Sequence, residues 1–286
     1  MPTRKPNEMA LQECQRAIEA NAPARLQPLI EAGVSVDQKI GDCPRRTLLE
    51  FAIEKNAVEV VKFLIAAGAE LDKGFYKPLI EAALLNRGEI VRILLEAGAD
   101  PNITISTPEE DLRDETALMH AVDQPDKIRV VELLLKHKAN PNLTTNQGLT
   151  ALDYAVDAEN VEAVRRLLEA GCKPVGPILH GAVFGGTRMG LELVKLLIAA
   201  SADLNAIGNR EAHLEGRTAL EGARQQLKEK TNSIRVLERR PREDWEEETL
   251  ERWKSDASIY QEMIQELTRA KASLCKSSLA RTMRQI

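Results

Sequence analysis

Histidine and cysteine are the residues of this sequence best suited to metal binding or nucleophilic chemistry, and both are few and scattered. The chain has 286 residues with four of each. Zinc sites and catalytic cysteines need ligands or partners at recognisable spacing, as in HExxH or CxxC. No such spacing joins His120, His137, His180 and His213, or Cys14, Cys43, Cys172 and Cys275. The sequence therefore predicts no metal site and no cysteine nucleophile.

Two short segments look like functional motifs but lack the residues that those motifs require. Residues 185–190, GGTRMG, are glycine-rich, yet no Lys-Ser or Lys-Thr pair follows them as in a phosphate loop. We interpret them as a widened turn inside one structural unit. Residues 239–242, RRPR, are basic but short and adjoin EDWEEE, which favours a solvated helix end over a nucleic-acid patch. No GxSxG occurs either. We expect no catalytic residue and no cofactor.

The charge and the apolar content of the sequence indicate which classes of partner and which compartment to expect. The formal net charge is −5, and a nucleic-acid-binding domain would be expected to be basic, so nucleic acid is not expected as a partner. No run of about 20 apolar residues that could cross a membrane occurs, and the N-terminal residues do not resemble a signal peptide. Scattered cysteines favour a reducing compartment. We expect a soluble, cytoplasmic protein.

A six-residue pattern with Leu in third place and Ala in sixth recurs along the chain. Successive third-position leucines lie 27 to 41 residues apart, and such a period indicates a repeat architecture. The copies are TLLEFA from Thr47, KPLIEA from Lys77, TALMHA from Thr116, TALDYA from Thr150, PILHGA from Pro177 and TALEGA from Thr218.

An amphipathic helical pattern follows each of the first five copies. These segments are VEVVKFLIAAGAELD from Val58, GEIVRILLEAGADPN from Gly88, IRVVELLLKHKANPN from Ile128, VEAVRRLLEAGCKP from Val161 and LELVKLLIAASADLN from Leu191. Over roughly residues 10–230 the paired motifs resemble the ankyrin repeat. That resemblance implies an all-α fold: an ankyrin-repeat solenoid of stacked helix-turn-helix repeats with short β-hairpin fingers, followed by a helical C-terminal segment.

Several residue types in the repeats have a local structural explanation. The motif threonines can cap the first helix of each pair, and the alanines allow neighbouring repeats to approach closely. Glycine after the second helix suits a left-handed C-cap, so we expect Lys138 and Ser201, which replace it, to strain two of these caps. His180 stands where the family has a histidine, and the resemblance implies that it braces a turn by hydrogen bonding.

The chain divides into three parts in this interpretation. Residues 1–38 form an N-terminal capping repeat, 39–230 the ankyrin repeats, and 231–286 a helical C-terminal cap or docking segment. In the last part an apolar stripe recurs at helical spacing, and it can either cover the last repeat or bind another chain, including a second copy. The stripe consists of Ile259, Met263, Ile264, Leu267, Ala270 and Leu274.

Ankyrin repeats are similar to one another in binding proteins through a concave face, made by the fingers and the exposed side of each first helix. Transfer of that face by register gives candidate partner-binding residues in every repeat. Phe75 and Tyr76 stand out because aromatic residues are frequent among interface hot spots, although a shortened finger could also pack them internally. The full set is Arg45, Arg46, Glu54, Lys55, Phe75, Tyr76, Leu84, Leu85, Arg113, Glu115, Asp123, Gln124, Asn146, Gln147, Leu149, Asp157 and Phe184.

The sequence thus favours a non-catalytic adaptor or inhibitor, of the immunity type for example, that binds another protein through this groove. Two alternatives remain open. One is an enzyme or effector with a functional C-terminal segment, in which the repeats select the substrate. The other is a structural protein that self-associates through the C-terminal helix.

Overall fold

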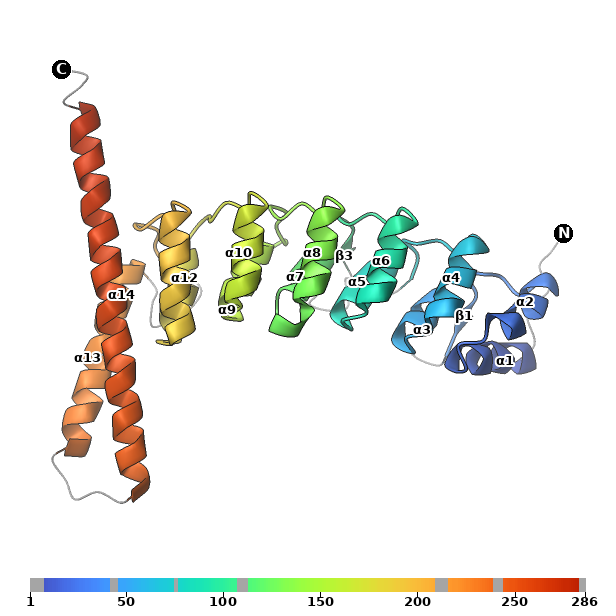
Figure 1. The fold of residues 1–286 in the computed structure, drawn as a ribbon, viewed down its shortest axis with the longest axis horizontal. Coiled ribbons are helices and arrows are strands. Elements are labelled where there is room, and N and C mark those ends of the chain that lie inside the picture. The colour runs from blue at the N-terminus through green and yellow to red at the C-terminus, as the bar shows by residue number, and fades with distance from the viewer. Residues whose placement is uncertain are drawn as a thin grey trace. The chain divides into compact units, whose positions relative to one another are not determined.

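The computed structural model describes residues 8–41, 46–74, 77–106, 113–208, 216–238 and 244–282. Helices dominate these ranges, and the named strands form two-stranded antiparallel hairpins (Figure 1). The chain falls into two compact units, Met1–Ala151 and Leu152–Ile286, each described by itself here.

Unit 1 is a double layer of helices. The first helices of successive pairs, α1, α3, α5 and α7, contact one another in order and form the inner layer. The second helices, α2, α4, α6 and α8, do the same in the outer layer. The bounds are α1 Glu8–Glu19, α2 Pro23–Glu31, α3 Leu48–Glu54, α4 Val58–Ala66, α5 Pro78–Leu84, α6 Gly88–Glu96, α7 Ala117–Ala121, a 3₁₀ turn at Pro125–Lys127, and α8 Ile128–Lys136.

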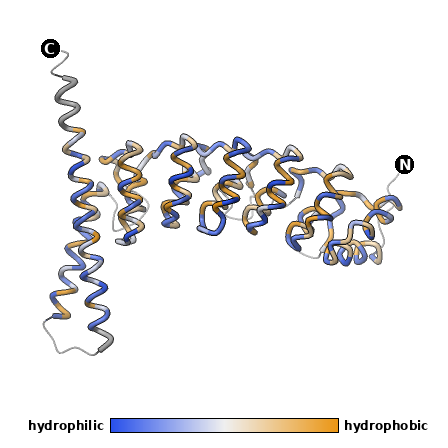
Figure 2. The backbone as a smooth tube through the Cα atoms, in the orientation of Figure 1, coloured by the Kyte–Doolittle hydropathy of each residue, from blue (hydrophilic) through white to orange (hydrophobic). Residues whose placement is uncertain are grey.

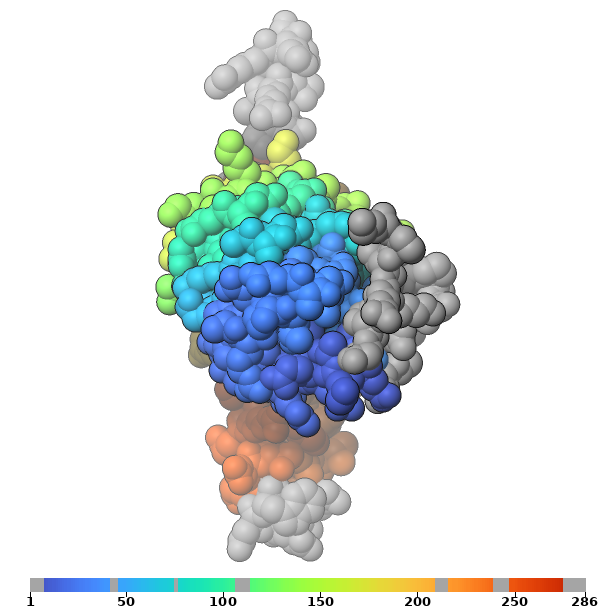
Figure 3. All heavy atoms as spheres, turned by 90° about the vertical axis from the view of Figure 1, so that its right-hand side faces the viewer, coloured from blue at the N-terminus to red at the C-terminus, as the bar shows by residue number. Residues whose placement is uncertain are grey.

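The recurring Leu and Ala of the sequence pattern form the core between neighbouring pairs. Leu49, Leu79 and Leu118 are buried, and so are the alanines three residues after each of them. Apolar residues alternate with polar ones along the repeat helices (Figure 2). At one end of the stack α1 and α2 lie over the later helices (Figure 3). Each pair therefore buries apolar surface against its neighbours as well as between its own two helices.

The motif threonines cap the inner helices, as the sequence predicts. Thr47 accepts a hydrogen bond from the Glu50 backbone N–H at 3.2 Å, and the Thr47 N–H donates to the Glu50 carboxylate at 2.7 Å. This reciprocal arrangement is a capping box. Thr116 accepts likewise from the backbone N–H of Met119 at 3.4 Å. Backbone groups that would lack partners at these helix starts are thus satisfied by the repeat's own side chains.

Two hairpins and two single bridges supply the fingers between pairs. In unit 1, β1 (Lys39–Ile40) pairs with β2 (Arg46–Thr47), and β3 (Thr104–Ser106) pairs with β4 (Arg113–Thr116). Thr144 and Thr150 form an isolated antiparallel bridge, and Ile207 and Thr218 form another in unit 2. Each pairing ends at the threonine that begins the next inner helix, so finger and helix are fixed together.

Unit 2 continues the pairs and adds two long helices. Its elements are α9 (Ala151–Asp157, beginning at the boundary), α10 Val161–Glu169, α11 Ile178–Phe184, α12 Arg188–Ala199, α13 Ala219–Glu238 and α14 Asp244–Thr282. Helix α13 packs on α11, and α14 packs on both α12 and α13. His180 braces the turn as predicted, because its ring nitrogens lie 3.0 and 2.6 Å from the carbonyl oxygens of Pro177 and Arg217.

Part of the apolar stripe on α14 is buried against this unit. Ile259, Met263 and Leu267 are almost fully buried, whereas Leu274 is 53% exposed. The Tyr260 hydroxyl donates to the Phe184 carbonyl at 3.1 Å, and Lys230 of α13 pairs with Asp256 at 2.7 Å. The middle of α14 is therefore a packed element of unit 2.

The glycine-rich segment at 185–190 lies directly beneath α14. A Cβ on Gly186 would lie 2.7 Å from the Tyr260 ring, and one on Gly190 would lie 2.4 Å from the Ala182 carbonyl oxygen. The turn predicted over residues 185–190 is shorter than expected, since α11 ends at Phe184 and α12 starts at Arg188 and includes Gly190. Its glycines allow two close helix contacts, one of which involves a helix far away in the sequence.

The two helix ends without glycine have the backbone conformation that the sequence predicts. Lys138 has φ 67° and Ser201 has φ 65°, in the region that Gly98 occupies with φ 94°. We expect Lys138→Gly and Ser201→Gly each to raise the free energy of unfolding by about 0.5–1 kcal/mol, because glycine removes the steric cost and its extra unfolded-state entropy offsets part of the gain. Urea denaturation measures it. Gly98→Ala is the matched control and should lower the free energy of unfolding, because alanine is strained in this left-handed conformation. The added Cβ would meet no atom within 4 Å, so backbone strain is the cause of the loss.

The packing of α14 predicts a second result. Met263→Ala should lower the free energy of unfolding of unit 2 by about 2–5 kcal/mol, because it leaves a cavity between α14 and α12. The exposed Met189 of α12 is the control, and Met189→Ala should change stability by less than about 0.5 kcal/mol. Hydrogen exchange of the α12 and α14 backbone amides shows whether the loss of stability lies at the contact between these two helices. Equal, small effects of both substitutions would contradict the buried contact.

Candidate protein-binding site

Four of the candidate partner-binding residues line one pocket in unit 1. Arg46 of β2, Glu54 at the end of α3, and Leu84 and Leu85 at the end of α5 surround a cavity of about 260 Å³, together with Glu81. We call it the α3–α5 pocket. Leu84 is 40% exposed, which is unusual for a leucine on an otherwise buried helix. Two inner helices and one finger therefore form a single small recess.

Charged side chains of the pocket are paired within the chain. One guanidinium nitrogen of Arg46, Nη1, contacts Glu54 and also lies 2.9 Å from Glu81 Oε1. Lys55 Nζ pairs with Glu54 Oε1 at 2.8 Å and lies 5.1 Å from the centre of the Phe51 ring. Arg46 thus links the finger to two successive inner helices.

Glu81 is the functional candidate that the sequence reasoning missed. Its side chain is 3% exposed, and its Oε2 has no hydrogen-bond partner within the ranges that the structure describes. Burial raises the pKa of Glu81 to about 7; Arg46 opposes this rise, while Glu50 and Glu54 add to it. Glu81 and Leu84 stand three residues apart on α5 and so share one face of the helix. A signal was present, because KPLIEA carries Glu where TLLEFA and TALDYA carry aromatic residues.

A second polar cluster lies at α7. His120 Nε2 lies 3.2 Å from Glu115 Oε2, and burial lowers the pKa of His120 below its ordinary value. Lys127 is buried and pairs with Asp123 at 2.8 Å while donating to the His120 carbonyl at 3.1 Å. Of the candidate partner-binding residues in this cluster, Glu115 contacts His120 and Asp123 pairs with Lys127, whereas Gln124 is exposed.

The remaining described candidates lie on separate parts of the surface. Asn146 and Gln147 are exposed at the tip of a turn that Thr145 closes by accepting from the Leu149 N–H at 3.2 Å. Leu149 itself is half-buried. In unit 2, Asp157 is exposed at the end of α9, and Phe184 is 42% exposed at the end of α11.

Some candidates lie outside the described residues. These are Arg45, Phe75 and Tyr76; for Arg113 the backbone belongs to β4 but its side chain is not described. The RRPR segment, Cys43 and His213 are also outside.

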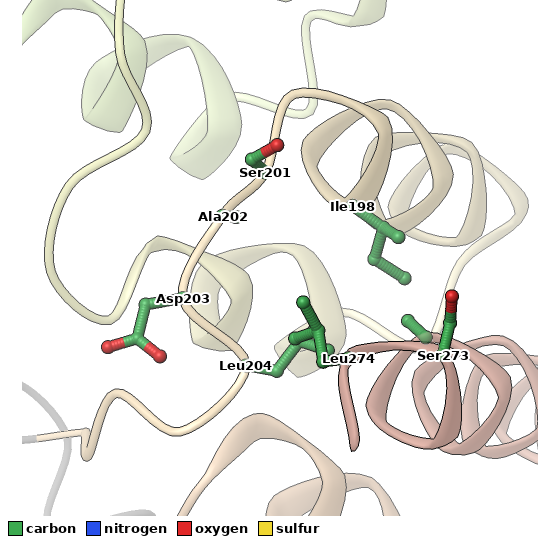
Figure 4. Close-up of a pocket in the computed structure, with 8 residues that line it drawn as sticks. Ile198, Ser201, Ala202, Asp203, Leu204, Ser273 and Leu274 are labelled. Atoms are coloured by element: carbon green, nitrogen blue, oxygen red, sulfur yellow. The ribbon is translucent and has the colours of Figure 1, made fainter. Parts of the chain in front are cut away.

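A larger cavity of about 450 Å³ lies in unit 2, beside α14. The turn after α12 forms one wall with Leu204, and α14 forms the other with Ala270, Ser273 and Leu274 (Figure 4). Packing is therefore looser at this end of α14 than around Met263.

Within the described ranges, the structure brings together no group of three His, Cys, Asp or Glu side chains that could hold a metal ion. Cys14 and Cys172 are buried and form no disulfide within the described residues, and burial raises the pKa of both thiols, to about 11 for Cys172. A thiol with a raised pKa is a weak nucleophile at neutral pH. No described helix combines the length and apolar character needed to cross a membrane.

Comparison with known proteins identifies the family to which the repeats belong. The family model described as ankyrin repeats (3 copies) matches residues 15–105 and 106–176. The chain is similar to an ankyrin repeat-containing protein of Treponema pallidum, with 36% identity over 130 residues, which are 44% of this chain and 41% of that protein. It is also similar to an ankyrin repeat protein of fowlpox virus, with 32% identity over 130 residues, 43% of this chain and 36% of that protein.

A longer match joins the chain to a much larger protein. The E3 ubiquitin-protein ligase hecd-1 of Caenorhabditis elegans is 27% identical over 202 residues, which are 64% of this chain but 7% of the ligase. The chain thus spans less than half the length of each of these three relatives.

The buried Glu81 predicts a pH-dependent stability. Its pKa is raised from 4.5 to about 7 in the folded chain, so the folded state holds the proton more tightly than the unfolded state does. The resulting stabilisation is complete below about pH 4.5 and is lost as the pH rises through 7. Between pH 4.5 and 8, the unfolding free energy of Glu81→Gln should therefore rise by about 2–3 kcal/mol relative to that of the wild type.

Urea denaturation at several pH values measures this difference. Glu59→Gln on the outer helix α4 is the matched control, because Glu59 is exposed. If the difference in unfolding free energy between Glu81→Gln and wild type were as independent of pH as that of the control, the folded chain would ionise Glu81 without loss of stability, and the raised pKa would be contradicted.

Proposed function

This chain belongs to the ankyrin-repeat family, and from that premise we propose that it is a non-catalytic interaction module that binds a protein partner through the inner side of its repeats. Ankyrin repeats form a protein-interaction scaffold, and the adaptor or inhibitor role is the specific proposal. Its mechanism would be occlusion or scaffolding of the partner. The proposed location is the cytoplasm.

One observation carries the proposal: the α3–α5 pocket combines an exposed apolar side chain with fixed charges. Leu84 is exposed beside Glu54 and Arg46, whose ion pair is held by the finger. Interfaces combine apolar anchors with polar groups that set orientation. The other inner-layer candidates, such as Gln124 and Asn146, would supply the polar rim.

We further propose that residues 231–286 act mainly as a C-terminal cap. The burial of Ile259, Met263 and Leu267 on α14 supports this role, because a terminal repeat needs a cover for its apolar face. The exposed Leu274 leaves the end of α14 as a candidate for self-association.

The test begins with identification of the partner. The full chain, tagged, is used to capture proteins from its native source, and each captured protein is purified and titrated against wild-type chain and variants by calorimetry. Leu84→Glu should weaken the affinity at least tenfold, because truncating or charging a central apolar anchor costs more than about 1.4 kcal/mol.

Met189→Glu provides the matched control, since Met189 is an exposed apolar residue on α12 in unit 2. It should leave affinity unchanged, and melting curves should show both variants folded. A partner that binds Leu84→Glu as tightly as wild type would contradict the proposed face.

A further inference from the structure

We propose that the α3–α5 pocket receives a cationic side chain, an arginine or a lysine, from the partner's segment. This inference rests on the proposed function and specifies the chemistry of the partner. The incoming cation would bind Glu81 at the bottom of the pocket while its aliphatic part lies along Leu84 and Leu85.

The shape and lining of the pocket fit such a side chain. Glu81 is its most deeply buried residue, while Glu54 is about one-third exposed and Leu84 forms an apolar wall. Lysine and arginine bury their aliphatic stems on apolar surface and direct the charged end to polar groups. An apolar wall above a buried carboxylate has the corresponding arrangement.

Hydrogen bonding at the bottom of the pocket is incomplete. Glu81 Oε1 receives Arg46, and Arg46 Nη1 is shared with Glu54. Glu81 Oε2, although buried, has no partner among the described residues. A buried acceptor without a donor is costly, and a charged donor is the strongest group that can satisfy it. The chain's own use of Arg46 at this point shows which class of group the carboxylates accept.

The cationic side chains near the pocket contact mainly Glu54, which leaves Glu81 able to accept a further cation. Lys55 pairs with Glu54, and Arg87 donates to the Glu54 carbonyl at 3.2 Å. Both of these contacts involve Glu54 and not Glu81. Among the described cations, Arg46 is the one that contacts Glu81, and it contacts Glu54 as well. In the bound state Arg46 would stay with Glu54, and the partner's cation would take Glu81 Oε2.

Protonation gives the inference a distinct signature. The pKa of Glu81 is raised to about 7, so near neutral pH about half of the molecules carry a proton on this carboxyl. A cation that binds Glu81 favours the ionised form and displaces that proton. Binding should therefore release a fraction of a proton at pH 7 and should strengthen as the pH rises from 6 to 8.

A random library of 12-residue peptides, selected on the full chain at pH 7.5, provides the probe. Peptides whose affinity falls with Leu84→Ala are resynthesised with each arginine replaced by citrulline or each lysine by acetyllysine, which keep the shape but remove the charge. We expect at least a tenfold loss of affinity for one such replacement with wild-type chain, and less than a twofold change with Glu81→Gln. Calorimetry in two buffers of different ionisation enthalpy should show proton release with wild type and none with Glu81→Gln.

Glu59→Gln is the control of equal charge change and should behave as wild type. Peptides that need Leu84 but are indifferent to loss of their cations and to Glu81→Gln would overturn this inference and leave the proposed function standing. A selection that yields no peptide responsive to Glu81→Gln would also overturn it. Failure of the proposed function is recognised separately, by a natural partner that ignores Leu84→Glu.

Discussion

The structure depends on apolar faces that no single helix pair can bury alone. Leu and Ala at fixed positions of each inner helix, such as Leu79 and Ala82 of α5, are buried only because neighbouring pairs stack on both sides. This constraint explains why the ends of the chain differ from the middle. Helices α1 and α2 cover one end of unit 1, and α14 covers α12 and α13 in unit 2. The close approach of α14 in turn requires glycine at positions 186 and 190, where any side chain would collide with Tyr260 or with α11.

The same constraint leaves the residue types at the fifth and eighth motif positions free to vary. In successive copies the fifth position holds Phe51, Glu81, His120 and Tyr154, and the eighth holds Glu54, Leu84, Asp123, Asp157 and Phe184. Some of these side chains contact others within the chain, as His120 does with Glu115. Others remain available, as the exposed Leu84 and the unpartnered oxygen of Glu81 do. Binding specificity in this account comes from variation on a face that the fold does not constrain.

Much of the fold could be predicted from the sequence, because the repeat pattern reports local geometry. The motif threonine predicted the helix cap at Thr47. Lys138 and Ser201 stand where other repeats have glycine after the second helix, and this position predicted their left-handed backbone conformation. Two features could not be read in this way. The ion pair of the buried Glu81 depends on Arg46, which a finger more than thirty residues away brings to it, and the glycine at 186 accommodates Tyr260 of a helix some 70 residues later. Helix α13 likewise runs on past residue 231 to Glu238, since packing on α11 and α14 supports it beyond the repeat pattern.

The central claim is that a protein partner occupies the inner layer of unit 1. Hydrogen–deuterium exchange of the full chain, with and without the purified partner, tests it most directly. The account predicts added protection at the ends of α3 and α5 and in the adjoining β2, and none in the outer helices α4 and α6. Protection confined to the outer helices, or to α14 alone, would contradict it.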